Sequence, residues 1–158
     1  MKQDVTISFE RFNHWSELSK SDQELVEHAN AVCKTAYAPY SKFHVGASLR
    51  LSNNEVVTGS NQENIAYPSG LCAERVALFY SGANFPNESV ETLCVVAEGD
   101  LLPIDKILSP CGACRQVMLE TEVRQKKNYR VILVSQNGVT IVFSSAADLL
   151  PLAFGITD

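Results

Sequence analysis

The chain has 158 residues, of which 46% are hydrophobic and 20% are charged. This length fits one domain of about 150 residues, and the composition excludes a disordered, collagenous or low-complexity chain. Thirteen Lys and Arg residues stand against eighteen Asp and Glu residues, which gives a formal net charge of −5. Because Lys and Arg contacts to phosphate supply most of the non-specific affinity for nucleic acid, we expect no nucleic-acid partner.

The sequence also argues against a membrane protein and against a disulfide framework. No segment reaches the roughly 20 apolar residues of a membrane-spanning helix, and residues 1–15 lack the hydrophobic stretch of a secretory signal. The five cysteines, an odd number, favour metal binding or reactive thiols over disulfides. We therefore expect a cytoplasmic protein with no membrane partner.

An N-terminal extension, residues 1–20, is expected to precede a domain that covers residues 21–158. Within the extension Val5, Ile7 and Phe9 alternate with polar residues, as in a short strand. Nothing in the extension suggests chemistry, so we interpret it as structural.

Hydrophobic spacing and turn signals predict the elements of the domain. Ser21 and Glu24 form a capping box before a run of helical period, and Asn137-Gly138 is a strong hairpin signal. Strands interleaved with helices predict an α/β fold of three layers, α/β/α, with a mixed five-stranded sheet. The predicted elements are a helix from Ser21 that ends before Pro39, strands Val45–Leu51 and Glu55–Ser60, a helix Cys72–Ser81, a strand Leu93–Ala97, a helix Cys111–Thr121, strands Arg130–Ser135 and Val139–Phe143, and a short helix between Ser145 and Pro151.

Three cysteines lie where two of these helices begin. Cys72 stands in Cys-Ala-Glu-Arg, and Cys111 and Cys114 stand in Pro-Cys-Gly-Ala-Cys-Arg. The unpaired N–H groups and the dipole of a helix start favour the thiolate, which is the form of Cys that binds metal. Three thiolate ligands leave the fourth position of a zinc tetrahedron for water, as in catalytic sites. We predict one Zn²⁺ per chain, bound by Cys72, Cys111 and Cys114.

Glu74 follows Cys72 by two residues and is placed as a general base rather than as a ligand. Zinc deaminases of nucleobases combine a Glu at this offset with a downstream Pro-Cys-x-x-Cys segment. In that chemistry Glu74 takes a proton from the zinc-bound water, delivers one to the ring N3 and helps to protonate the departing ammonia. The alternative is an ordinary carboxylate in the first turn of a helix.

Five motifs follow one another between residues 37 and 155: Tyr37 to Ala47, Asn61-Gln62-Glu63-Asn64, Cys72-Ala73-Glu74-Arg75, Pro110 to Gln116 and Leu149-Leu150-Pro151. In these motifs and in their order the chain resembles the homotetrameric cytidine deaminases of the pyrimidine salvage pathway. The resemblance implies hydrolytic deamination of free cytidine and 2′-deoxycytidine to uridine and 2′-deoxyuridine plus ammonia. It also implies a homotetramer whose four sites lie at subunit boundaries.

Further roles follow from the same resemblance. Arg75 is expected to act on the metal through its ligands, because three thiolates around Zn²⁺ sum to a net charge of −1 that a nearby cation would offset. The resemblance implies that Phe43 stacks on the base, that Asn61 and Glu63 hold the ribose 3′-hydroxyl, and that the backbone N–H of Ala73 binds the pyrimidine O2. Each side chain also has an ordinary structural alternative. Arg75 could be a surface arginine and Phe43 a core aromatic residue, and Asn61 and Glu63 could be polar residues of turns or strand ends.

Tyr67 and Phe154 resemble residues that reach the site of a neighbouring subunit, although either could be a packing aromatic. Ile65 departs from the family's pattern, in which a small residue near the nucleoside 5′-hydroxyl is expected. The departure leaves open the shape of that edge of the pocket.

The remaining cysteines and histidines are expected to play no part in the chemistry. Cys33 lies on an apolar helical stripe and Cys94 in a buried-strand pattern, so both are interpreted as core residues. No histidine stands at a metal-ligand spacing, so these residues are interpreted as surface or packing residues. The histidines are His14, His28 and His44.

Three rival functions stay open. A deaminase of a cytosine-containing antibiotic such as blasticidin S would share the three-cysteine site. A polynucleotide-editing deaminase would need a basic channel for the strand, which the acidic chain lacks. A structural zinc module would have four protein ligands and would depend on the metal for its fold.

Overall fold

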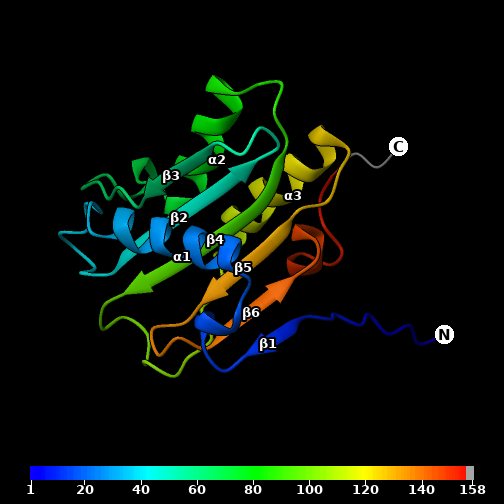
Figure 1. Ribbon diagram of the computed structural model, residues 1–158, viewed down its shortest axis with the longest axis horizontal. Helices are drawn as coiled ribbons and strands as arrows, with labels where there is room; N and C mark the ends of the chain where they lie inside the picture. The colour runs from blue at the N-terminus through cyan, green and yellow to red at the C-terminus, as the bar shows by residue number, and fades with distance from the viewer. Residues whose placement is uncertain (156–158) are drawn as a thin grey trace.

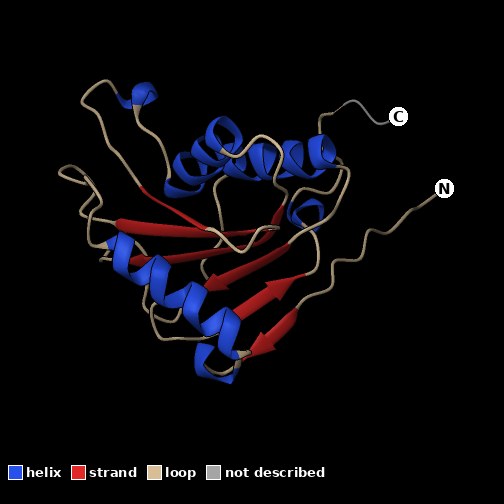
Figure 2. Ribbon diagram, turned by 45° about the horizontal axis from the view of Figure 1, so that its top comes forward, coloured by secondary structure: helices blue, strands red, loops and turns tan. Residues whose placement is uncertain are grey.

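The computed structural model describes residues 1–155. Within them six strands form one mixed sheet in the order β1-β6-β5-β4-β2-β3, with helices on both faces (Figure 1, Figure 2). No helix in this range is both long enough and apolar enough to cross a membrane. The elements are β1 (Glu10–Phe12), η1 (Trp15–Glu17), α1 (Lys20–Cys33), β2 (His44–Leu51), β3 (Val56–Ser60), η2 (Tyr67–Ser69), α2 (Ala73–Asn84), β4 (Val90–Glu98), α3 (Gly112–Gln125), β5 (Arg130–Val134), β6 (Thr140–Phe143) and η3 (Ala146–Leu149).

The helices divide between the two faces of the sheet. α1 packs on one face, against β2, β3 and β4, whereas α2 and α3 lie together on the other face (Figure 2). β4 and β5 are parallel and joined through α3, while the other strand pairs are antiparallel. The predicted α/β architecture, its mixed sheet and the antiparallel final hairpin are therefore confirmed.

The sheet has six strands rather than the predicted five, because β1 pairs with β6. The added strand begins after Phe9, so the prediction that Val5, Ile7 and Phe9 form it was wrong by a few residues. β6 would otherwise end the sheet with unpaired N–H and C=O groups, and a short strand that covers this edge satisfies them. Sequence alternation alone does not reveal such a partner.

Residues that follow β1 complete the core on the α1 face. Trp15 and Leu18 join the hydrophobic cluster that contains Ile132, Val134 and Val142 of β5 and β6. The backbone N–H of Trp15 donates to the carbonyl of Gly138 over 3.0 Å, which ties this segment to the final hairpin. Part of the predicted extension therefore packs on the same sheet as the domain.

The start of α1 also differs from the prediction. Ser19, not Ser21, is the N-cap residue, and its hydroxyl accepts a hydrogen bond from the N–H of Asp22 over 3.2 Å. Asp22 lies in the first turn of this helix and faces the sheet, where its carboxylate pairs with Arg130 at 3.0 Å and with Arg50 at 3.5 Å. The ion pairs come from distant strands, so the capping pattern of the sequence did not show them.

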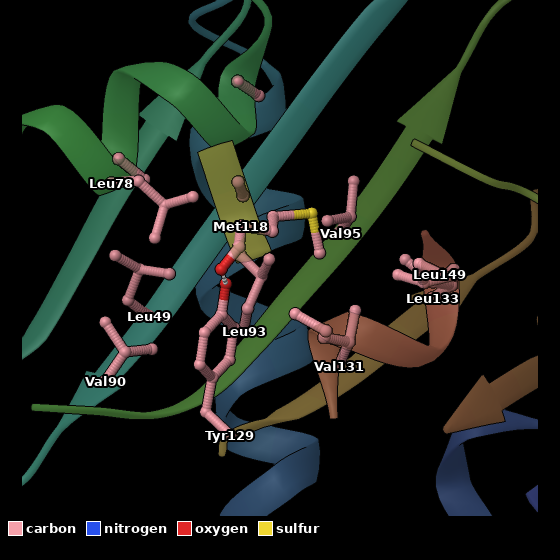
Figure 3. Close-up of a cluster of buried hydrophobic side chains, with 14 of the residues drawn as sticks. Leu49, Leu78, Val90, Leu93, Val95, Met118, Tyr129, Val131, Leu133 and Leu149 are labelled. Carbon is pink, nitrogen blue, oxygen red and sulfur yellow. Dashed lines mark hydrogen bonds between the residues drawn. The ribbon is translucent and has the colours of Figure 1, made fainter. Parts of the chain in front are cut away.

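The core on the other face holds α2 and α3 in place. Figure 3 shows Met118 of α3 among Leu93, Val95 and Val131 of the central strands. α2 lies directly on β3 because Gly59 has no side chain: an added Cβ would stand 2.6 Å from the backbone nitrogen of Ala77. The close approach at Gly59 holds α2 against β3, and the packing of Met118 holds α3 over the central strands.

Candidate active site

The two helix starts bring three thiols together. Cys72 is the N-cap residue of α2 and Cys111 that of α3, with Cys114 in the first turn of α3. The Sγ atoms of Cys72 and Cys111 are 3.8 Å apart, and those of Cys111 and Cys114 are 3.4 Å apart. All three Sγ atoms lie within 4.8 Å of one another. The structure therefore gathers the predicted ligands into one cluster.

The geometry of this cluster fits a zinc ion. Zn–S bonds of about 2.3 Å at tetrahedral angles place two sulfur ligands about 3.8 Å apart, close to the separations observed here. Within residues 1–155 the cluster contains three thiols and no histidine or carboxylate. A tetrahedral ion held by it would therefore keep one position for a ligand from outside the protein, as catalytic zinc sites do.

Hydrogen bonds among the thiols set their protonation. A hydrogen bond with Cys114 and another with Arg75 lower the pKa of Cys72 to about 5, although burial opposes the shift. The bond to Cys72 in turn raises the pKa of Cys114, because it stabilises the protonated form of the donor. A divalent ion would stabilise all three thiolates at once.

Glu74 lies in the first turn of α2 and its side chain is buried, at 4% exposure. Burial raises the pKa of this carboxyl to about 7; a backbone hydrogen bond opposes the shift, and the charge of Cys72 adds to it. Carboxyls with raised pKa values that stand beside a metal-ligand cluster are typical of general acid–base sites. The structure thus places a proton carrier beside the thiols.

Arg75 adds a positive charge to the cluster. Its Nη2 donates to the Sγ of Cys72 over 3.8 Å. Its Nε is buried and has no hydrogen-bond partner in the part of the chain that the structure describes. A buried N–H without an acceptor is uncommon in folded proteins, and here it stands beside sulfur atoms that a metal would draw together.

A cavity of about 510 Å³ opens beside the cluster. Polar and aromatic side chains from the loop between β3 and α2 form much of its wall, together with the turn before β2. This volume suits a molecule of nucleoside size, since small-molecule pockets usually measure about 300 to 1,000 Å³. The lining residues are Tyr40, Ser41, Asn61, Gln62, Glu63, Asn64, Tyr67, Gly70, Leu71, Cys72 and Arg75.

The sequence matches a known protein family over most of its length. The family model of the cytidine and deoxycytidylate deaminase zinc-binding region matches residues 19–129. A cytidine deaminase from Halalkalibacterium halodurans is 37% identical over 136 residues, which are 86% of this chain and 96% of that protein. The chain belongs to the cytidine deaminase family.

The solved structures of the family share this fold. The crystal structure of cytidine deaminase from Burkholderia pseudomallei is similar with a TM-score of 0.71 and 41% identity, covering 84% of this chain and 98% of that one. A blasticidin-S deaminase from Bacillus cereus is also similar, at 26% identity over 87% of this chain and 94% of that protein. The match to a zinc-binding region of this family agrees with the three-thiol cluster.

The two predicted ribose residues line the cavity, and both already make hydrogen bonds. Asn61 Oδ1 accepts from the N–H of Val45 over 2.7 Å, and its Nδ2 donates to the carbonyl of Phe43 over 2.9 Å. Glu63 accepts from the N–H of Tyr40 over 2.9 Å and from the hydroxyl of Ser41. The bond from Ser41 lowers the pKa of Glu63. Both side chains hold the turn before β2 in place.

The two residues predicted to contact the base are both buried. Phe43 is 9% exposed, and its ring belongs to the core cluster rather than to the cavity lining. Ala73 is the first residue of α2, which carries no side-chain cap at its start. The first N–H groups of a helix have no partner within it, so the N–H of Ala73 can serve an external acceptor.

Three further predicted residues are exposed in the single chain. Tyr67 is 75% exposed and lines the cavity, where its ring meets Tyr40 edge-on at 5.9 Å. Ile65 is 81% exposed and Phe154 is 90% exposed, and neither lines the cavity. Within one chain the structure therefore does not bring these two residues to the thiol cluster.

The cavity also shows residues to which the sequence gave no role. Tyr40 and Ser41 form part of its wall and bind the carboxylate of Glu63. Both stand inside the Tyr37 to Ala47 motif, which was the only signal that could have found them. Cys33 and Cys94 lie in the core, as predicted.

Proposed function

We propose that the chain catalyses the hydrolytic deamination of cytidine and 2′-deoxycytidine to uridine and 2′-deoxyuridine plus ammonia. The observation that carries the proposal is the cluster of Cys72, Cys111 and Cys114 beside buried Glu74. A structural zinc module would have four protein ligands, whereas this cluster has three within residues 1–155. One Zn²⁺ per chain is proposed.

Cys72, Cys111 and Cys114 would hold the ion. When bound, Zn²⁺ lowers the pKa of a water molecule and so supplies a nucleophile at neutral pH. Glu74 removes a proton from the attacking water and delivers it to the ring N3, and the C4–O bond forms. It then passes the second proton of the water to the amino group as the C4–N bond breaks. Ammonia leaves, and the carboxylate returns to its starting state.

The buried position of Glu74 suits this task. A carboxyl at 4% exposure has little contact with bulk water, so its proton moves mainly between the reacting groups. Arg75 offsets the negative charge of the thiolates through its hydrogen bond to Cys72. Without this positive charge, three thiolates would oppose the formation of hydroxide at the site.

We propose that the cavity wall binds the rest of the nucleoside. Asn61 and Glu63 would form hydrogen bonds with the ribose 3′-hydroxyl, and the N–H of Ala73 would donate a hydrogen bond to the pyrimidine O2. Phe43 would contact the base, and the bond from Asn61 to its carbonyl supports this by tying it to a cavity residue. Among residues 1–155, Arg75 is the one cation that lines the cavity, which favours a neutral nucleoside over a nucleotide.

We also propose a homotetramer with shared sites. Large aromatic side chains are exposed around the cavity and on α2, and such surfaces on one chain usually mark contacts with another. Tyr67 and Phe154 would reach a neighbouring site, and Ile65 would lie near the 5′-hydroxyl there. The exposed aromatics include Tyr37, Tyr40, Tyr67, Phe79, Tyr80 and Phe154.

Pyrimidine salvage in the cytoplasm is the proposed setting. Five free cysteines, three of them in the proposed metal site, need a reducing compartment. We propose that residues 21–158 carry the reaction and that residues 1–20 are an extension that stabilises the sheet.

The test follows the absorbance loss of cytidine while zinc per chain is measured in the purified protein. Cys111→Ala should lose both zinc and activity, because two thiols hold the ion poorly. Cys33→Ala, which removes a core thiol away from the cluster, is the matched control and should keep both. No deamination by the wild-type protein at full zinc occupancy would overturn the proposal.

Competition distinguishes the antibiotic deaminase. Cytidine and blasticidin S are supplied together, and their products are separated. A higher kcat/KM for cytidine supports the nucleoside enzyme, and a higher value for blasticidin S would make the antibiotic its substrate.

A further inference from the structure

Glu122 is a buried carboxylate that the proposed reaction does not use. It lies on α3, eight residues after Cys114, and therefore about 12 Å further along the helix axis. Its side chain is 5% exposed, and no ion pair among residues 1–155 includes it. A buried charge without a cation must be stabilised by hydrogen bonds.

Those hydrogen bonds come mainly from the start of η3. The hydroxyl of Ser145 donates to Oε2 of Glu122 over 2.7 Å, and the N–H of Ala146 donates to Oε1 over 2.7 Å. The N–H of Ala147 adds a bond of 3.2 Å, and that of Tyr129 a bond of 3.0 Å. Hydrogen bonds to an ionised acceptor are roughly twice as strong as neutral ones. Glu122 is thus the anchor for the first residues of η3.

The same helix holds the chain beyond η3. Arg115 donates to the carbonyl of Leu149, the last residue of η3, over 3.0 Å. Gln116 donates through Nε2 to the carbonyl of Phe154 over 2.9 Å. Side chains of α3 therefore bind the C-terminal segment at three points, which are the start of η3, the end of η3 and Phe154. Residues Pro151 to Gly155 are exposed, so these bonds fix much of their position.

We propose that Glu122 is a positioning residue for substrate binding: it anchors η3 and, through η3, the segment that carries Phe154. The inference rests on the proposed function, in which Phe154 closes the site of a neighbouring subunit. η3 is a four-residue 3-10 helix, and such short pieces have few internal bonds of their own. Loss of the anchor frees the start of η3, and Phe154 then spends less time in its closing position.

The test compares Glu122→Gln with Asp22→Asn. Both replace a buried carboxylate by the amide of the same shape, but Asp22 lies on the α1 face and binds Arg50 and Arg130. In the wild-type chain both carboxylate oxygens of Glu122 accept hydrogen bonds from the start of η3. In Glu122→Gln an NH₂ group, which cannot accept them, replaces one of these oxygens. We expect its KM for cytidine to rise about tenfold, with kcat and zinc per chain within about twofold of wild type. Asp22→Asn should lower the thermal midpoint and leave KM unchanged.

Two milder variants keep the test decisive if Glu122→Gln does not fold. Ser145→Ala removes one of the four donors, and Gln116→Ala removes the bond to Phe154; each should raise KM by about three- to fivefold. Normal KM in both, or in Glu122→Gln, would overturn the inference. Equal losses of kcat and of zinc would also overturn it, because they indicate general damage to α3.

Hydrogen exchange supplies a readout that needs no activity. Backbone amides from Ala147 to Phe154 should exchange faster in Glu122→Gln than in wild type and Asp22→Asn, whether or not cytidine is the substrate. Unchanged exchange there would contradict the anchoring role. If these amides exchange faster in Glu122→Gln but the wild-type protein does not deaminate cytidine, the anchoring role stands and only the proposed function is overturned.

Discussion

Asp22 and Glu74 are buried carboxylates at the starts of helices on opposite faces of the sheet. Each lies in the first turn of its helix, and each residue is 4% exposed. Asp22 pairs with Arg130 at 3.0 Å and with Arg50 at 3.5 Å. Glu74 has no ion pair among residues 1–155, and burial raises its pKa to about 7. One carboxylate holds the fold together, and the other is left able to exchange a proton.

The contrast extends to the faces on which these helices lie. On the α1 face Trp15 and Leu18 cover strands that α1 leaves open, so the core there is closed within one chain. On the α2 and α3 face, Phe79 and Tyr80 remain 50% and 53% exposed. The α1 face, whose core is covered by residues of the same chain, serves stability. The α2 and α3 face carries exposed aromatic side chains and a buried carboxylate without an ion pair among residues 1–155, and these features are typical of binding surfaces and reactive sites.

The largest expected effect comes from replacing the carboxylate of Glu74 by an amide. Glu74→Gln should lower kcat by about 10⁴ or more, because it removes a group that serves several proton transfers. Its zinc content and thermal midpoint should equal or exceed those of wild type, since a neutral amide carries no charge to desolvate. Steady-state kinetics, metal analysis and thermal unfolding measure these quantities.

Asp22→Asn should show the opposite pattern, with activity kept and stability lost. The loss in free energy of unfolding should be about 2 kcal/mol, below the 3 to 5 kcal/mol of fully buried pairs, because the Arg130 side chain is 43% exposed. If Glu74→Gln keeps activity within about tenfold of wild type, the comparison fails at its central point.

An intermediate effect is expected for Phe154, through a neighbouring chain. Phe154→Ala should lower kcat/KM by about ten- to hundredfold, the value of one buried phenyl side chain. In assemblies mixed with inactive Glu74→Gln chains, intact Phe154 from the inactive neighbour should complete the Phe154→Ala sites. Activity per Phe154→Ala chain should then rise with the share of Glu74→Gln chains. A constant activity would refute the shared site.

The smallest effect is expected for Ile65. Replacing its butyl group by a methyl group removes three carbons from the proposed edge of the 5′-hydroxyl pocket. A hydroxyl buried without a partner costs about 1 to 3 kcal/mol, so relief should lower KM for cytidine about fivefold. KM for 5′-deoxycytidine should change less, and kcat should stay unchanged for both.

The control for Ile65 is the thermal midpoint of the assembled protein. If Ile65 packs only between subunits, Ile65→Ala leaves a cavity and lowers that midpoint without a difference between the two nucleosides. An equal change in KM for cytidine and for 5′-deoxycytidine would likewise show that Ile65 has only a packing role.

Local patterns were sufficient for most elements of the fold. The predicted strands Val45–Leu51 and Glu55–Ser60 correspond to a pair of antiparallel neighbours, β2 and β3, and the final hairpin forms at Asn137-Gly138, where the turn residues predict it. Helix α2 begins directly after Cys72 and α3 directly after Cys111, as the motifs predict. The errors came where a distant segment decides, as with β1 on β6 and the start of α1 at Ser19.

By itself the sequence determined the chemistry of each helix start, because the residues concerned stand within a few positions of one another: Cys72 and Glu74 at one start, Cys111 and Cys114 at the other. It therefore predicted Cys72, Cys111, Cys114 and Glu74 as one group, and the structure brings the three thiols within 4.8 Å. Only the tertiary structure decided which buried charges find partners: Asp22 meets Arg50 and Arg130, and Glu122 meets the start of η3. Such pairs join residues far apart in the chain, and no periodicity or spacing in a single sequence records them.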